Sequence, residues 1–239
     1  GDPFEHYCAS WYQRLHQGME VRRVDLKSAE GRASMATLLD ECDLLVSAQR
    51  PSALGRLNLD AASLAARHPR LCHVNITGHP VPEEETPGHD LTYMAMHGLV
   101  SPGAMPATLF ADMAGAERAV STALALVIAR DREGRGRTAA APLEDAAAAL
   151  AAPLREGLTS PGTLLGGGLA GYNLYEAQGG WIAVAALEPH FAQRLADSLR
   201  LASLTVESLR ARFASDTAKN WEAWARKRDL PLVALRTLT

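Results

Sequence analysis

The first half of the chain alternates short helical patterns with short apolar segments. Its periodicity predicts helices over residues 31–42 and 60–68, and strands over residues 43–48 and 71–77. Strands that alternate with helices in this way form a parallel sheet with helices packed against it. The sequence therefore predicts an α/β fold whose large domain is a doubly wound parallel sheet.

A proline-rich loop separates these elements from a second group of helices. The loop covers residues 79–88 and carries the run Glu83–Glu84–Glu85, which we interpret as solvated acids on the surface. Helical patterns follow over residues 90–99, 112–130 and 143–152, with Pro142 placed to open the last of them.

A glycine-rich segment over residues 160–171 has the composition of a linker, or of a loop that a ligand can approach closely. We therefore place a domain boundary between residues 158 and 159. Beyond it, residues 172–177 and 181–186 flank Gln178–Gly179–Gly180 and predict a β-hairpin. Helical patterns near residues 189–199, 205–213 and 217–226 complete a small α+β domain over residues 159–239.

Composition excludes several classes of function. The chain has 239 residues, a formal net charge of -3 and 47% hydrophobic residues, so it can bury a core but lacks the basic surplus of a nucleic-acid-binding protein. Its apolar stretches are too short to span a membrane, and it opens on no charged and apolar leader. Cys8, Cys42 and Cys72 lack the spacing of metal ligands. We expect a cytoplasmic protein with free thiols, no metal site and no membrane or nucleic-acid partner.

Three titratable residues stand in short motifs, and each has an ordinary structural explanation when taken alone. Asp112 lies at the start of a predicted helix, where an Asp is most often the N-cap. The free amides and positive dipole end of that helix would also favour an anionic oxygen of a ligand. His89 follows Pro–Gly, where a surface or capping role is common, and Glu188 lies where a strand gives way to a helix and can simply face water.

Together, and in this order, the motifs resemble those of CoA-transferase family III, the CaiB/BaiF superfamily, and within it the α-methylacyl-CoA racemase branch. The motifs are Gly88–His89–Asp90–Leu91–Thr92–Tyr93, Ala111–Asp112–Met113–Ala114–Gly115 and Ala186–Leu187–Glu188–Pro189–His190–Phe191. The segments Asp25–Leu26–Lys27, Arg50–Pro51, Pro69–Arg70–Leu71 and Arg130 to Arg137 support the resemblance.

The resemblance implies a two-base isomerase acting on an acyl-CoA thioester. His89, oriented by Glu188, and Asp112 would flank the α-carbon, so that one removes the α-proton and the other returns a proton to the opposite face. The developing enolate needs stabilisation, which amides at a helix start can supply.

The resemblance also implies how the substrate is held. Arg50, Tyr93 and Met113 match positions that bind the coenzyme A part of the substrate. Coenzyme A would enter only as part of the acyl-CoA substrate, and no permanently bound cofactor is expected. The resemblance also implies a role in lipid metabolism.

Two alternatives stay open. In the CoA-transferases of the family, the aspartate that matches Asp112 attacks the thioester, forms a mixed anhydride and then carries CoA as an aspartyl thioester. In that reading His89 and Glu188 are spectators. A third reading is a degenerate, non-catalytic subunit of a heteromeric complex.

Departures from the family pattern motivate that third reading. Gln17–Gly18–Met19–Glu20 stands where relatives have a basic segment near the nucleotide phosphates, and Ser52 replaces a glycine. The chain opens after the first strand–helix–strand unit of relatives and stops before their return to the large domain, so the resemblance implies a truncated large domain. It also implies an interlocked homodimer, with a heteromer as the alternative.

Overall fold

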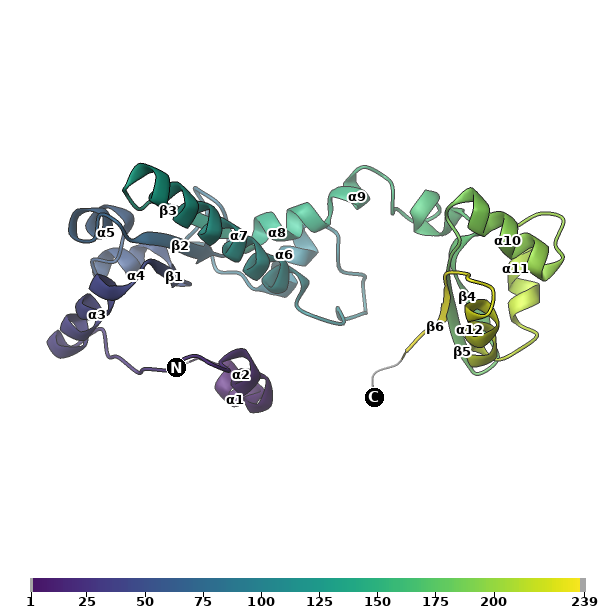
Figure 1. Cartoon of the computed structure of the whole chain (residues 1–239), viewed down its shortest axis with the longest axis horizontal. Coiled ribbons are helices and arrows are strands. Elements are labelled where there is room, and N and C mark those ends of the chain that lie inside the picture. Colours follow the sequence, from purple (N-terminus) through teal and green to yellow (C-terminus); the bar gives the residue numbers. More distant parts are fainter. Residues whose placement is uncertain (1, 237–239) are drawn as a thin grey trace. The chain divides into compact units, whose positions relative to one another are not determined.

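The computed structural model describes residues 2–236 and divides into two compact units (Figure 1). The large unit is Gly1–Ala149 and the small unit is Leu150–Thr239. The division comes at the end of an alanine-rich helix, α8 (Leu143–Leu150), and so earlier than the boundary placed at residue 158. Each unit has its own sheet and its own apolar core.

The large unit contains a parallel three-stranded sheet. Its strands are β1 (Leu44–Ser47), β2 (Cys72–Thr77) and β3 (Thr138–Pro142), in the order β1-β2-β3. The register pairs Val46 with Val74 and Val74 with Ala139. The parallel sheet predicted from the sequence is confirmed, and β3 adds a strand that the sequence did not predict.

Helices cover both faces of this sheet. Successive residues of a strand point to opposite faces, and Leu44 and Leu45 accordingly join different clusters. Leu44 packs with Val74 against Ala119 and Ala123 of the long helix α7 (Phe110–Glu133). Leu45 packs against a leucine cluster supplied by α3 (Ala29–Glu41), α4 (Pro51–Arg56) and α5 (Ala61–Arg67).

A smaller cluster joins α6 (Asp90–Met96), α7 and α8. Tyr93 and Met94 of α6 are buried with Ala111 of α7 and Ala147 of α8. Gly115 allows α7 to approach α8, because a Cβ atom at this position would collide with the side chain of Leu143. This packing fixes the start of α7 beside the start of α6.

Some helices of the large unit begin or end at other residues than the sequence predicted, and three short ones were not predicted at all. α7 begins at Phe110, before the predicted start at residue 112, and ends at Gly134, whose φ of 76° allows the left-handed cap. Two short helices, α1 (Phe4–Tyr7) and α2 (Ala9–Leu15), precede α3, and neither was predicted. The helix α4 was not predicted either.

The small unit contains an antiparallel sheet and several helices. The predicted hairpin is confirmed as β4 (Tyr172–Ala177) and β5 (Gly180–Ala185), and β5 also pairs with β6 (Leu232–Ala234), which was not predicted. The unit begins with α9 (Ala152–Arg155) and the glycine-rich turn Leu164–Gly168. Its three longer helices, whose cluster buries Phe213 and Trp221, are α10 (Pro189–Leu199), α11 (Val206–Phe213) and α12 (Ala218–Arg226).

No helix within residues 2–236 is long and apolar enough to cross a membrane.

Candidate active site

A cleft of about 330 Å³ lies beyond the carboxyl ends of the three parallel strands. Ala48 follows β1, Gly78 follows β2 and Leu143 follows β3, and all three line the cleft together with His89 and Tyr93. In open α/β sheets, ligands bind at this edge because the loops that follow the strands converge there. The cleft is therefore the candidate active site of the large unit.

His89 occupies the residue position immediately before α6. Its backbone N–H donates to Thr92 Oγ1 at 3.0 Å, and the same hydroxyl donates to the His89 carbonyl oxygen at 2.8 Å. These two bonds fix the start of the helix, and the His89 side chain is exposed and lines the cleft. A proton carrier needs this combination of a fixed backbone and an accessible ring.

Asp112 lies in the first turn of α7, but its side chain is not the cap that the sequence predicted. The cap position is Leu109, which has no polar side chain, because the helix starts earlier than expected. The capping acceptor comes from α6 instead: the Asp112 N–H donates to Asp90 Oδ1 at 3.0 Å. This amide is therefore already engaged and does not serve as the oxyanion donor that the sequence analysis expected at Asp112.

The environment of Asp112 favours its neutral form. Burial is the main cause that raises the pKa of its carboxyl, and the negative charge of Asp90 raises it further. The charge of His89 acts in the opposite direction and lowers the same pKa. The structure thus brings His89 and Asp112 into one electrostatic environment, with Asp90 as a third member.

Tyr93 forms the floor of the cleft. Its side chain is 2% exposed and packs edge-on against His79, with ring centroids 5.1 Å apart. A Cβ atom at Gly78 or Gly88 would collide with the Tyr93 ring or hydroxyl, so only glycine fits at either position. Burial and the charges of Asp112 and Glu144 raise the pKa of Tyr93, so its hydroxyl keeps its proton and is a hydrogen-bond donor at neutral pH.

Arg50 is an exposed cation at the rim of the cleft. It precedes α4, and the first turn of that helix is tied to the loop over residues 79–88. Glu85 accepts from the Ser52 N–H at 2.7 Å and from the Ser52 hydroxyl at 2.8 Å, which lowers the pKa of Glu85. Glu85 is exposed, as the sequence analysis expected, and it also fixes the loop beside Arg50.

Met113 and Glu188 lie outside this cleft. Met113 is 53% exposed on α7 and accepts a hydrogen bond from Thr108 Oγ1 at 3.5 Å through its sulfur. Glu188 belongs to the small unit, where it precedes α10 and is exposed. The orientation of His89 by Glu188 stays a prediction.

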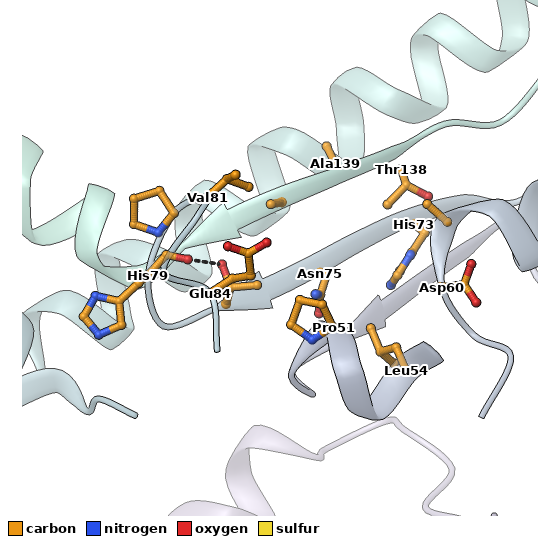
Figure 2. A pocket seen from close by; sticks show the side chains of 14 residues that line it. Pro51, Leu54, Asp60, His73, Asn75, His79, Val81, Glu84, Thr138 and Ala139 are labelled. Atoms are coloured by element: carbon orange, nitrogen blue, oxygen red, sulfur yellow. Dashed lines mark hydrogen bonds between the residues drawn. The ribbon is translucent and has the colours of Figure 1, made fainter. Parts of the chain in front are cut away.

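A second cavity of about 330 Å³ lies on the α4 and α5 face of the sheet and shares Thr77 and Glu84 with the first (Figure 2). His73, Asn75 and Thr77 project into it from alternate positions of β2. His73 Nε2 lies 2.7 Å from Ser47 Oγ, and burial lowers the pKa of His73. Sequence analysis missed this cavity, although polar residues at every second position of a buried strand were the available signal.

No group of three or more His, Cys, Asp or Glu side chains suited to a metal ion occurs in the part of the chain that the structure describes.

Comparison with known proteins settles the family. The sequence model of CoA-transferase family III matches residues 1–239. The chain belongs to CoA-transferase family III. It is 29% identical over 211 residues to the alpha-methylacyl-CoA racemase of Homo sapiens, an alignment that covers 80% of this chain and 54% of the racemase. It is also 28% identical over 152 residues to a succinate–glutarate CoA-transferase of Agrobacterium fabrum, covering 57% of this chain and 38% of that protein.

Solved structures share the fold. A crystal structure of a hypothetical protein from Mycobacterium tuberculosis superimposes with a TM-score of 0.78 at 21% identity, covering 92% of this chain and 68% of that one. A CaiB/BaiF family protein from Brucella suis gives a TM-score of 0.71 at 22% identity, with 90% and 65% coverage. The family contains both racemases and CoA-transferases, and the chain spans about half the length of the human racemase.

Proposed function

We propose that this protein exchanges the α-proton of a 2-methylacyl-CoA thioester, with His89 and Asp112 as the two proton carriers. One observation carries the proposal: the exposed imidazole of His89 lines the cleft at the strand ends, and the half-buried carboxyl of Asp112, which is not one of the lining residues, shares its electrostatic environment and has a pKa that burial raises. A carboxyl with a raised pKa exchanges protons more readily near neutral pH.

The chemistry needs both groups in two protonation states. In one direction Asp112 removes the α-proton as a carboxylate, and protonated His89 delivers a proton to the opposite face of the enolate. In the other direction neutral His89 removes the proton and the Asp112 carboxylic acid returns one. Burial of Asp112 favours its carboxylic acid, which the second direction of the exchange requires.

The substrate contacts follow from the same cleft. Arg50 supplies a positive charge at the rim for coenzyme A phosphates, and the protonated Tyr93 hydroxyl is available to a polar group of the pantetheine arm or thioester. Met113 offers an exposed apolar surface for the acyl chain. Glu188 would orient His89, and coenzyme A would be present only as part of the substrate.

CoA transfer is the competing activity, favoured by the likeness to the Agrobacterium fabrum transferase. In this reaction an Asp112 oxygen attacks the thioester carbonyl, the C–S bond breaks, and CoA thiolate leaves an aspartyl anhydride. The thiolate then attacks the aspartyl carbonyl, which forms an aspartyl–CoA thioester and releases the first acid as its carboxylate. An acceptor carboxylate runs the two steps in reverse, leaves as its own CoA thioester and regenerates the Asp112 carboxylate. The transfer reaction gives no role to His89, whose exposed imidazole lines the cleft, and this favours proton exchange.

The test is incubation with one enantiomer of a 2-methylacyl-CoA in D2O, followed by NMR of the α-position and by optical rotation. We expect wild type to incorporate deuterium and lose optical activity together, and Asp112→Asn and His89→Ala each to lose racemisation by at least about a hundredfold. Glu117→Gln, an exposed charge change on the same helix, is the matched control and retains the rate.

Two other outcomes are informative. If no deuterium is incorporated and hydroxylamine traps an Asp112 acyl adduct, the protein is a CoA-transferase and the isomerase proposal fails. If neither deuterium incorporation nor an acyl adduct is detected, the result supports a non-catalytic subunit of a heteromeric complex.

A further inference from the structure

Asp90 is a buried carboxylate beside the site whose role no part of the proposed reaction uses. Asp90 is only 5% exposed, although it is the first residue of α6 and carries a charge. A carboxylate that is nearly fully buried needs hydrogen bonds to offset its lost hydration. The structure supplies one of them across to α7, where Asp90 Oδ1 accepts the Asp112 N–H at 3.0 Å.

This single bond has two physical consequences. It satisfies a donor in the first turn of α7 that no side chain of that helix caps, because Leu109 stands at the cap position. It also holds a second negative charge close to the carboxyl of Asp112. Like charges in a partly buried site oppose the ionisation of each other.

We propose that Asp90 is a positioning residue for proton exchange: its carboxylate fixes the first turn of α7 and supplies the charge against which Asp112 takes up and releases its proton. This inference rests on the proposed function for its catalytic meaning. Its structural and electrostatic content does not depend on that function.

A charge beside Asp112 matters because the exchange depends on the relative proton affinities of Asp112 and His89. Free aspartic acid and histidine titrate about 2 to 3 pH units apart, so, of the two states of an unperturbed pair that carry one proton, carboxylate with imidazolium greatly outweighs carboxylic acid with imidazole. That state serves only one direction of the exchange. The charge of Asp90 and the burial of Asp112 both favour the carboxylic acid, which brings the second state within reach.

Other charged groups around Asp112 do not duplicate this effect. His89, at the start of α6, lowers the pKa of the Asp112 carboxyl. Tyr93, on the same helix as Asp90, has a raised pKa and stays neutral at pH 7. Glu144 of α8 and Arg50 before α4 act on Tyr93, where their charges oppose each other. Asp90 is thus the carboxylate that both touches the backbone of Asp112 and acts on its charge.

The experiment is a pH titration of the Asp112 carboxyl carbon in the whole chain labelled with 13C-aspartate, assigned by loss of the signal in Asp112→Asn. Asp90→Asn keeps an oxygen acceptor for the Asp112 N–H and removes only the charge. Asp90→Ala removes both. Glu117→Gln is the matched control, because it removes an exposed charge from the same helix.

We expect Asp90→Asn to move the Asp112 titration to lower pH, and Glu117→Gln to leave it in place. Hydrogen exchange at the Asp112 amide should remain slow in Asp90→Asn and accelerate in Asp90→Ala. With a 2-methylacyl-CoA, Asp90→Asn should slow deuterium exchange by roughly tenfold at neutral pH with an unchanged KM, because Asp90 is buried and is not one of the residues that line the cleft.

An Asp112 titration that is identical in wild type and Asp90→Asn would overturn the charge role, and an amide equally protected in Asp90→Ala would overturn the positioning role. If wild type exchanges no α-proton, the proposed function fails, but the titration and the amide measurement still decide the role of Asp90.

Discussion

Replacing Gly78 with alanine should destabilise the large unit, and shortening Tyr93 to phenylalanine in the same chain should restore most of the loss. The added Cβ atom at Gly78 would first collide with the Tyr93 hydroxyl, while the next atom, Cζ, lies 3.3 Å away. Overpacking of a full core costs about 1–3 kcal/mol. Without the hydroxyl, the remaining 3.3 Å contact is tight but tolerable.

Gly88 provides the matched control because it faces another part of the same ring. A Cβ atom at Gly88 would collide with Cε1 of Tyr93 and would lie 2.7 Å from the hydroxyl and 2.8 Å from Cζ. Tyr93→Phe removes only the hydroxyl, so the closest contact remains and Gly88→Ala should keep most of its cost in both backgrounds. The double-mutant cycle predicts a coupling of about 1–2 kcal/mol between positions 78 and 93, and a clearly smaller coupling between positions 88 and 93.

The assay is hydrogen exchange of peptides from β2 and α6, which reports the large unit separately from the small one. A coupling of about 1.4 kcal/mol corresponds to a tenfold change in the opening constant. The packing argument is refuted if Tyr93→Phe rescues Gly88→Ala as well as Gly78→Ala, or rescues neither.

Three further outcomes follow from the structure. Tyr175→Phe removes a buried hydroxyl that donates to the Ala170 carbonyl at 2.7 Å, and it should cost about 1 kcal/mol in urea unfolding of the small unit. Burial raises the pKa of Tyr175 to about 12, so the unfolded chain loses this proton at a lower pH than the folded chain does. The stabilisation is therefore present below about pH 10 and declines above it. Burial lowers the pKa of His73, so as the pH falls the unfolded chain protonates this imidazole before the folded chain does. The large unit should therefore lose stability below about pH 6.5, and His73→Phe should abolish this effect in acid titrations. Thr217→Ala removes the acceptor of the Asn220 N–H at 3.1 Å and should cost about 1 kcal/mol, measured by Trp fluorescence in urea.

The sequence predicted elements with strong local patterns and missed those that depend on neighbours. α10 was placed at its observed bounds because a strand, a proline and an amphipathic pattern mark it. β3 is mostly alanine, which has little preference for strands, and it forms because the edge of β2 is available to it. β6 is short and pairs with β5 from far along the chain, so no local signal announces it.

In the candidate site, too, local patterns predicted some features, and contacts between distant residues decided the others. The motifs placed His89 and Asp112 at loop-to-helix transitions, and in the structure the two residues lie near the starts of α6 and α7 in the large unit. They did not reveal that Asp90 would cap the helix of Asp112, since that bond joins residues from two helices. The earlier start of α7 decided the outcome, because it removed Asp112 from the cap position and left an amide for Asp90 to engage.

The measurement that tests the central claim most directly is α-proton exchange in D2O, started separately from each enantiomer of a 2-methylacyl-CoA. The account predicts deuterium incorporation from both enantiomers with wild type, convergence to the same racemic product, and loss of that convergence in both Asp112→Asn and His89→Ala. Exchange that persists undiminished in either variant, or that starts from one enantiomer alone in wild type, would contradict the assignment of His89 and Asp112 as paired proton carriers.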